Sequence, residues 1–169
     1  ATLRQLQHYQ SEMAFWFPSA ELRSKELDQL CRSHLFPQEQ RPRLPDRVLH
    51  GMMRGFMDLV FVQQERYYVL DYKSNLLGTR DADYEAPHLR AQMLRHRYEL
   101  QASLYQLALH RLLRQRLGQH YLPEKHLGGT LLFFLRGIQA PQRGMLHLPA
   151  NIALIENMDR LFAVGELVS

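Results

Sequence analysis

Two apolar segments separated by only three residues constrain the fold of this chain most strongly. Residues 52–62 and 66–74 both have the composition of β-strands, and the short turn at residues 63–65 predicts that they pair as an antiparallel hairpin. Neither face of this hairpin is polar, because apolar side chains stand at successive positions, as in residues 59–62. Strands of this kind belong in a central sheet that is covered on both sides.

Strand and helix patterns alternate before the hairpin. An aromatic-rich strand is predicted at residues 10–17, and Ser19 is a candidate N-cap for a helix that reaches about Leu35. Three prolines between residues 36 and 46 then predict an irregular surface connection.

After the hairpin the sequence predicts two helices and one more strand. A long helical pattern covers residues 87–117 and ends at Gly118; a buried strand follows at residues 130–136 and a last helix at residues 149–163. The order of elements predicts an α/β fold in which a central mixed sheet is flanked by helices, and residues 1–169 form a single domain.

Composition limits the classes of function. The 169 residues carry 21 Lys and Arg against 17 Asp and Glu, a net charge of +4 that permits a nucleic-acid partner without requiring one. Cys31 is the only cysteine, which excludes an intrachain disulfide and indicates a reducing compartment. Neither a secretory signal pattern nor an apolar stretch long enough for a bilayer is present in the sequence.

Three charged residues interrupt the apolar hairpin: Asp58, Asp71 and Lys73. Such residues are depleted from strand interiors, and an unpaired charge is costly to bury. Residues i and i+2 of a strand share a face, so Asp71 and Lys73 should point together while Tyr72 points the other way into the core. The paired strand would bring Asp58 alongside them.

Two carboxylates beside a lysine suit metal-assisted phosphate chemistry. Carboxylate oxygens bind a hard cation such as Mg²⁺, which polarises a phosphodiester, and a lysine can orient or help deprotonate the attacking water or stabilise the transition state. The alternative is a buried Asp–Lys ion pair that only fixes strand register, which is the commoner meaning of an isolated Asp-X-Lys. The second aspartate on the preceding strand favours the metal site.

A wider pattern surrounds these residues. It comprises Gly-Met-Met-Arg-Gly-Phe-Met-Asp-Leu-Val-Phe at 51–61, Tyr-Tyr-Val-Leu-Asp-Tyr-Lys-Ser-Asn-Leu-Leu-Gly at 67–78, a Gln-xxx-Tyr helix motif at Gln101 and Tyr105, and a glycine-led strand at 128–137. The pattern covers nearly the whole chain and resembles the nuclease domain of RecB-type helicase–nucleases, within the PD-(D/E)XK nuclease superfamily.

The resemblance implies a restriction-endonuclease-like core and a Mg²⁺-dependent deoxyribonuclease of the exodeoxyribonuclease V type. It makes Asp58 and Asp71 metal ligands, with the backbone carbonyl of Tyr72 as an additional ligand, and Lys73 the catalytic lysine.

The resemblance also implies supporting roles for three other residues. Gln101 and Tyr105 lie one helical turn apart and would contact DNA or support the acidic residues; ordinary positions on an amphipathic helix are the alternative. Glu12 fits the family's earlier acidic position and would orient a second metal or a water, unless it is a solvated glutamate of an edge strand.

The implied setting is the bacterial cytoplasm, with no membrane. The partners would be DNA, RecC-like and RecD-like subunits and the recombinase RecA, and the reaction would serve double-strand-break repair and recombination. DNA contact should be mainly to phosphates. Six arginines on the long helix could form a basic face for this contact, or the face could simply be solvated. They are Arg90, Arg95, Arg97, Arg111, Arg114 and Arg116. No Gly-xxxx-Gly-Lys-Ser/Thr loop is present, so ATP dependence would belong to helicase domains of the parent enzyme.

One part of the family pattern is missing from the chain. RecB-type nucleases place a metal-binding histidine in a helix upstream of the first aspartate, whereas His8 has no matching motif and should be exposed. We therefore expect a fragment that lacks the upstream helicase domains and this histidine segment, and that binds metal and cleaves weakly. The rival hypothesis is a weak or inactive domain that docks DNA or the recombinase. A Cas4-like nuclease is disfavoured because iron–sulfur cysteines are absent.

Overall fold

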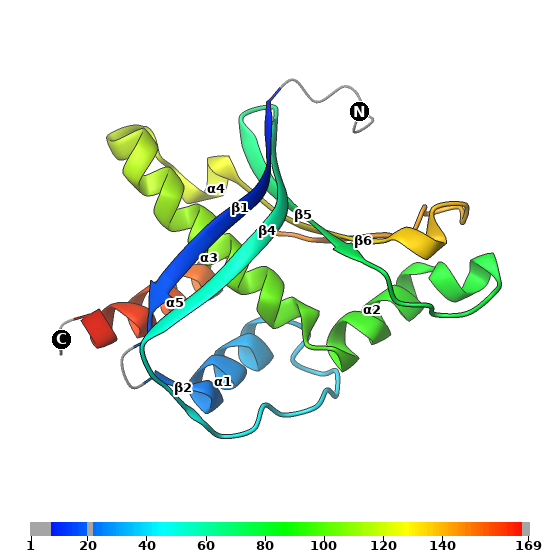
Figure 1. Ribbon diagram of the computed structural model, residues 1–169, viewed down its shortest axis with the longest axis horizontal. Helices are drawn as coiled ribbons and strands as arrows, with labels where there is room; N and C mark the ends of the chain where they lie inside the picture. Colours follow the sequence, from blue (N-terminus) through cyan, green and yellow to red (C-terminus); the bar gives the residue numbers. More distant parts are fainter. Residues whose placement is uncertain (1–7, 20–21, 167–169) are drawn as a thin grey trace.

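The centre of the fold is a five-stranded mixed β-sheet. The structure is a computed structural model that describes residues 8–19 and 22–166. Across the sheet the strands follow the order β1 (Tyr9–Pro18), β4 (Met52–Gln63), β5 (Arg66–Lys73), β6 (Leu127–Phe134) and β7 (Met145–Leu148) (Figure 1). Strands β5 and β6 are parallel and the other neighbours antiparallel. A two-stranded sheet pairs β2 (Leu22–Arg23) with β3 (Val48–Leu49). The predicted α/β fold with a mixed sheet is confirmed.

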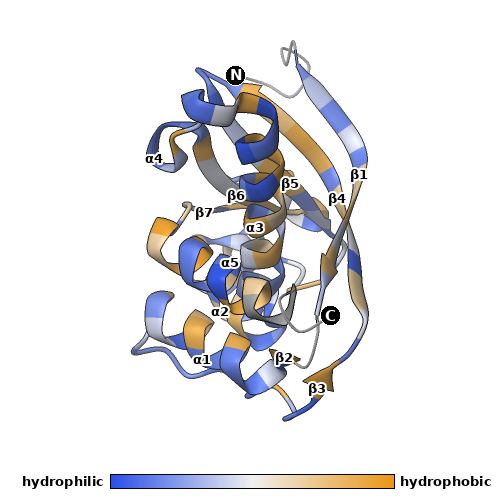
Figure 2. Ribbon diagram, turned by 90° about the vertical axis from the view of Figure 1, so that its left-hand side faces the viewer, coloured by the Kyte–Doolittle hydropathy of each residue, from blue (hydrophilic) through white to orange (hydrophobic). Residues whose placement is uncertain are grey.

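The described helices lie on one side of this sheet, and α1 packs on α3 and α5 (Figure 2). They are α1 (Ser24–His34), α2 (Ala86–Arg95), α3 (Tyr98–Leu117), α4 (Pro123–His126) and α5 (Ile152–Glu166). The main hydrophobic core lies between these helices and the sheet. A second, smaller cluster has only strand residues and occupies the other face: Leu59, Phe61, Leu70 and Phe133, with Tyr68, Leu131 and Met145 beside them. The expectation that the sheet is covered on both sides is therefore wrong for the described part of the chain. None of the described helices is long and apolar enough to span a membrane.

Strand β4 has β1 as a neighbour along most of its length and β5 as a neighbour only near the hairpin turn. It pairs with β1 from Met52 to Phe61, but its ladder with β5 begins at Gln63–Arg66 and ends at Leu59–Leu70. Beyond that pair β5 continues beside β6 to Lys73, while β4 continues beside β1. The two strands consequently part, and Figure 1 shows β5 turning toward α2 as β4 follows β1. We call the gap beyond Leu59 and Leu70 the fork.

Two predicted helices differ from the structure. Ser19 does not cap a helix: its hydroxyl donates to the carbonyl of Gly51 at 3.1 Å, and α1 begins only at Ser24, after β2. The long pattern at residues 87–117 is split, because Arg97 adopts a left-handed conformation with φ 59° and ends α2 before α3 starts. Helix propensities did not indicate this break, because residues 95–98 include neither glycine nor proline.

Buried ion pairs hold the corner between α2 and α3. Arg97 Nε lies 2.7 Å from Glu99 Oε1, and its Nη1 lies 2.7 Å from Asp28 Oδ1 on α1. Arg41, from the proline-rich connection, reaches the same Glu99 oxygen at 3.3 Å. Glu99 is fully buried, so removing any one partner would leave an uncompensated charge in the core. The cluster fixes where α3 begins.

Candidate functional site

The fork places Asp58 and Asp71 at corresponding positions on two separating strands. Asp58 directly precedes Leu59 and Asp71 directly follows Leu70, so the two aspartates would form the next pair if the ladder continued. Because the strands part there instead, no strand pairing joins the two residues, and the carboxylate of Asp58 lies close enough to that of Asp71 to raise its pKa. Asp71 is buried and Asp58 is half-buried.

A break in strand alternation turns Asp58 toward the helices. Met57 and Val60 both pack into the main core on the helix side, whereas Leu59 belongs to the opposite cluster. Regular alternation would put residues 57 and 59 on one face. The register of β1 places Glu12 opposite Asp58, but Glu12 is left out of the ladder and has φ 52°. The register of the two strands is unchanged on either side of this pair, so the irregularity is a local break in pairing that re-aims the Asp58 side chain.

A hydrogen bond crosses the fork. The backbone N–H of Tyr72 donates to Oδ2 of Asp58 at 2.8 Å. The Tyr72 side chain points to the other face, as predicted, but it is 40% exposed, and its ring centroid lies 6.0 Å from that of Phe133. Its predicted place in the core is wrong, because no described helix covers that face.

Asp71 and Lys73 share the helix-side face of β5. Lys73 Nζ lies 2.7 Å from Asp71 Oδ2 and donates a 2.6 Å hydrogen bond to Oε1 of Gln101 on α3. Gln101 Nε2 in turn donates to the hydroxyl of Tyr105 at 2.7 Å. The structure thus brings Asp58, Asp71 and Lys73 together with both residues of the helix motif.

Tyr98, which the sequence analysis did not single out, lies against Lys73. Lys73 Nζ is 3.9 Å from the centroid of the Tyr98 ring, and the Tyr98 hydroxyl donates to Asn75 Oδ1 at 3.0 Å. The available signal was spacing: residues three apart on a helix are neighbours, so Tyr98 precedes Gln101 on the same side of α3.

The site carries more negative than positive charge. Burial raises the pKa of Asp71; Lys73 opposes this shift, and the charge of Asp58 adds to it. Burial, followed by the charges of Asp71 and Asp58, also raises the pKa of Tyr105. Two carboxylates face one ammonium, so bringing a further cation to the site would relieve their repulsion.

The residues present fit a hard divalent cation. Asp71 Oδ2 is buried and accepts no hydrogen bond of normal geometry, despite its ion pair with Lys73. Within residues 8–19 and 22–166, no three His, Cys, Asp or Glu side chains gather in a metal-binding cluster. A cation between Asp58 and Asp71 would therefore complete its shell with backbone oxygens, water or substrate, as Mg²⁺ commonly does.

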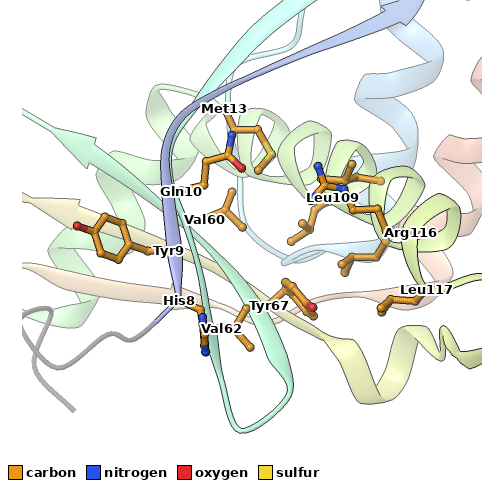
Figure 3. Close-up of a pocket in the computed structure, with 12 residues that line it drawn as sticks. His8, Tyr9, Gln10, Met13, Val60, Val62, Tyr67, Leu109, Arg116 and Leu117 are labelled. Atoms are coloured by element: carbon orange, nitrogen blue, oxygen red, sulfur yellow. The ribbon is translucent and has the colours of Figure 1, made fainter.

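An apolar hollow lies away from the fork. It has a volume of about 420 Å³ and is lined by the start of β1, the hairpin end of β4 and β5, and the second half of α3 (Figure 3). Exposed His8 and Arg116 contribute polar groups to its lining, but none of Asp58, Asp71 and Lys73 does. The hollow is thus separate from the candidate site.

Several of the arginines expected to form a basic helix face pair with acidic residues of the protein. Arg97 is buried, Arg90 pairs with Glu39 at 3.2 Å, and Arg111 and Arg114 both bind Asp159, at 2.6 and 2.7 Å. Much of the positive charge of these arginines is therefore neutralised by ion pairs within the protein.

Comparisons with known proteins identify relatives. The model of the PD-(D/E)XK nuclease superfamily matches residues 3–160. The RecBCD enzyme subunit RecB of Escherichia coli K12 is 44% identical over 157 residues, which is 91% of this chain and 13% of that protein. The RecB subunit of Haemophilus influenzae is 40% identical over 130 residues, 76% of this chain and 10% of the relative. The RecB subunit of Mycobacterium tuberculosis H37Rv is 46% identical over 96 residues, which is 56% of this chain and 9% of that protein. The chain spans at most 13% of the length of these relatives.

Proposed function

The chain belongs to the PD-(D/E)XK nuclease superfamily, and on that basis we propose that it is the Mg²⁺-dependent DNA nuclease domain of a RecB-type helicase–nuclease. Its mixed sheet with helices is the restriction-endonuclease-like fold of this superfamily. The observation that supports the proposal most is the meeting of Asp58, Asp71 and Lys73 where β4 and β5 part.

In this proposal Asp58 and Asp71 hold the cation, with the backbone carbonyl of Tyr72 as a further ligand. A bound Mg²⁺ supplies Lewis acidity, which polarises a phosphate oxygen and stabilises negative charge. Asp71 is suited to this task because its carboxylate is buried and close to a second carboxylate. A divalent ion would offset both the burial and the repulsion.

Lys73 acts on the phosphodiester beside the cation. Its ammonium group either orients the water that attacks phosphorus or stabilises charge on the phosphoryl oxygens. Gln101 holds that ammonium from α3 and is itself held by Tyr105. Glu12, opposite Asp58, would orient a water or a second cation from β1.

The proposed setting follows from the relatives. The E. coli protein is named as a subunit of the RecBCD enzyme, so we propose that this domain works in a multisubunit helicase–nuclease with RecC-like and RecD-like partners, in double-strand-break repair and recombination. Contact with DNA would be mostly to phosphates, and docking of a RecA-like recombinase is part of the same proposal.

The test is Mg²⁺-dependent degradation of linear DNA by the full-length protein that carries this domain. Asp71→Asn should lower the rate by about 100-fold or more, because it removes a metal ligand. Glu39→Gln is the matched control: it neutralises a carboxylate that pairs with Arg90 at the surface, and should leave the rate unchanged. Full activity of Asp71→Asn would overturn the proposal. A wild-type protein that binds DNA or recombinase but neither cleaves nor responds to Mg²⁺ would instead be a docking module.

A further inference from the structure

The ammonium group of Lys73 is surrounded by partners from three places in the chain. Asp71 Oδ2 lies 2.7 Å away on the same strand, Gln101 Oε1 lies 2.6 Å away on α3, and the centroid of the Tyr98 ring lies 3.9 Å away at the start of α3. Lys73 is only 8% exposed, so water competes little with these contacts. The Tyr98 ring is the one partner of the three that belongs neither to the aspartates nor to the Gln-xxx-Tyr motif.

The contact has the geometry of a cation–π interaction. An ammonium within about 6 Å of a ring centroid is attracted by the negative face of the ring, and more strongly where both groups are shielded from water. A ring cannot accept the ammonium as a strong hydrogen bond, so Tyr98 attracts the charge without using up a donor that Lys73 needs for substrate.

Tyr98 itself is held rigidly. Its hydroxyl donates to Asn75 Oδ1 at 3.0 Å, just two residues after Lys73. Its ring stacks on His96, with centroids 5.2 Å apart and an interplanar angle of 17°. Both contacts limit rotation of the ring.

The backbone on either side of Tyr98 is also fixed. Arg97 and Glu99 flank it in sequence, and both are buried in the ion-pair cluster with Asp28 and Arg41. The first turn of α3 therefore cannot shift without separating buried charges. The cluster gives the ring a defined position relative to β5.

We propose that Tyr98 is a positioning residue for Lys73: its ring, fixed by Asn75, His96 and the buried ion pairs, holds the ammonium in line with the two carboxylates. The inference rests on the proposed nuclease function, in which Lys73 acts on the phosphodiester. Tyr98 acts through Lys73 and touches no reacting atom.

The experiment compares two substitutions in the full-length protein with its partner subunits. Tyr98→Leu removes the ring and should lower kcat about tenfold, the size expected for one shielded cation–π contact, with little change in KM for DNA. Tyr98→Phe keeps the ring and loses only the hydroxyl, so it should retain kcat within about twofold. Tyr67→Leu is the control, since it also removes a half-buried ring from the main core but has no contact with Lys73; its kcat should equal that of the wild type.

A double-mutant cycle separates positioning from a general loss of structure. In a Lys73→Met background that retains measurable cleavage, Tyr98→Leu should cause no further decrease, because the ammonium it positions is gone. The same decrease in both backgrounds would overturn the proposal, as would a Tyr98→Leu protein with wild-type kcat.

If Tyr98→Leu fails to fold, His96→Ala replaces it. This substitution removes the exposed ring that stacks on Tyr98 and should lower kcat by a few-fold in the wild-type background alone. A wild-type protein without Mg²⁺-dependent cleavage would refute the proposed function itself, which is a different outcome from an active protein indifferent to Tyr98.

Discussion

The backbone amide of Tyr72 donates a 2.8 Å hydrogen bond to Oδ2 of Asp58, although the ladder between their strands has already ended at Leu59 and Leu70. The side chain of a proposed metal ligand thus replaces a strand–strand hydrogen bond. Asp58 has a structural task as well as the proposed chemical one.

Substitutions of Asp58 should separate these two tasks. Asp58→Asn keeps an oxygen that can accept from the Tyr72 amide, whereas Asp58→Ala removes it. We expect both to lose nuclease activity, but only Asp58→Ala to lower the free energy of unfolding, by about 1 kcal/mol. Urea unfolding in EDTA measures this difference. Equal stability of Asp58→Ala and the wild type would show that the hydrogen bond contributes nothing.

Mg²⁺ should stabilise the folded protein through Asp71. A ligand that binds only the folded state at 100 times its Kd raises the free energy of unfolding by about 2.7 kcal/mol. We expect thermal unfolding of the wild type to shift upward with Mg²⁺ and that of Asp71→Asn not to shift. A sodium salt of equal ionic strength is the control for screening. A Mg²⁺ response that persists in Asp71→Asn would place the cation elsewhere.

The buried cluster at the start of α3 should tolerate no loss of charge. Glu99→Gln leaves Arg41 and Arg97 without their shared anion, and we expect it to destabilise the fold by about 3–5 kcal/mol. Glu39→Gln breaks the exposed pair with Arg90 and should cost less than about 1 kcal/mol. Chemical denaturation of the two variants gives both values, and similar losses would contradict the distinction.

The pH dependence of stability should include a component from His110. Burial and the charge of Arg114 lower the pKa of His110, whereas the charges of Asp159 and Glu156 oppose this shift and that of Arg111 adds to it. Its Nδ1 is 2.8 Å from the hydroxyl of Tyr121. In the unfolded chain His110 takes up a proton near pH 6.5, but the folded protein resists this.

The contribution of neutral His110 is therefore fully present above about pH 6.5 and is lost as the pH falls toward the lowered pKa. We expect the stability difference between the wild type and His110→Gln to shrink over this window. Urea midpoints between about pH 5 and 8 would show it. His8→Gln, at an exposed position, should follow the wild-type curve, and a parallel His110→Gln curve would contradict the assignment.

Local sequence predicted β4 and β5 well and the other boundaries less well. Their apolar runs and the short turn between them are typical of a hairpin, and both were placed to within one residue. The strand expected at residues 130–136 is β6 at Leu127–Phe134, and the last helix, expected at residues 149–163, is α5 at Ile152–Glu166. The break at Arg97 depends on Asp28 and Arg41, which are distant in sequence, so no local pattern could indicate it. Strand β7 has four residues, too few for a periodic signal.

The sequence likewise predicted part of the candidate site. Alternation put Asp71 and Lys73 on one face, and their ion pair shows that arrangement. The predicted hairpin also put Asp58 beside them, because its register continues from Leu59 and Leu70 to Asp58 and Asp71. The parting of the strands at that point and the contact of Lys73 with Tyr98 depend on tertiary packing, which the spacing of the residues does not show.

The parting of β4 and β5 has a mechanical consequence. Each carboxylate-bearing strand is supported along the divergent stretch by a different outer neighbour, Asp58 through β1 and Asp71 through β6. Neither carboxylate therefore depends on the β4–β5 ladder for its support, and the hydrogen bond from the Tyr72 amide to Asp58 links the two strands across the fork. A change in the distance between β4 and β5 at the fork would require no hydrogen bond of either outer ladder to break.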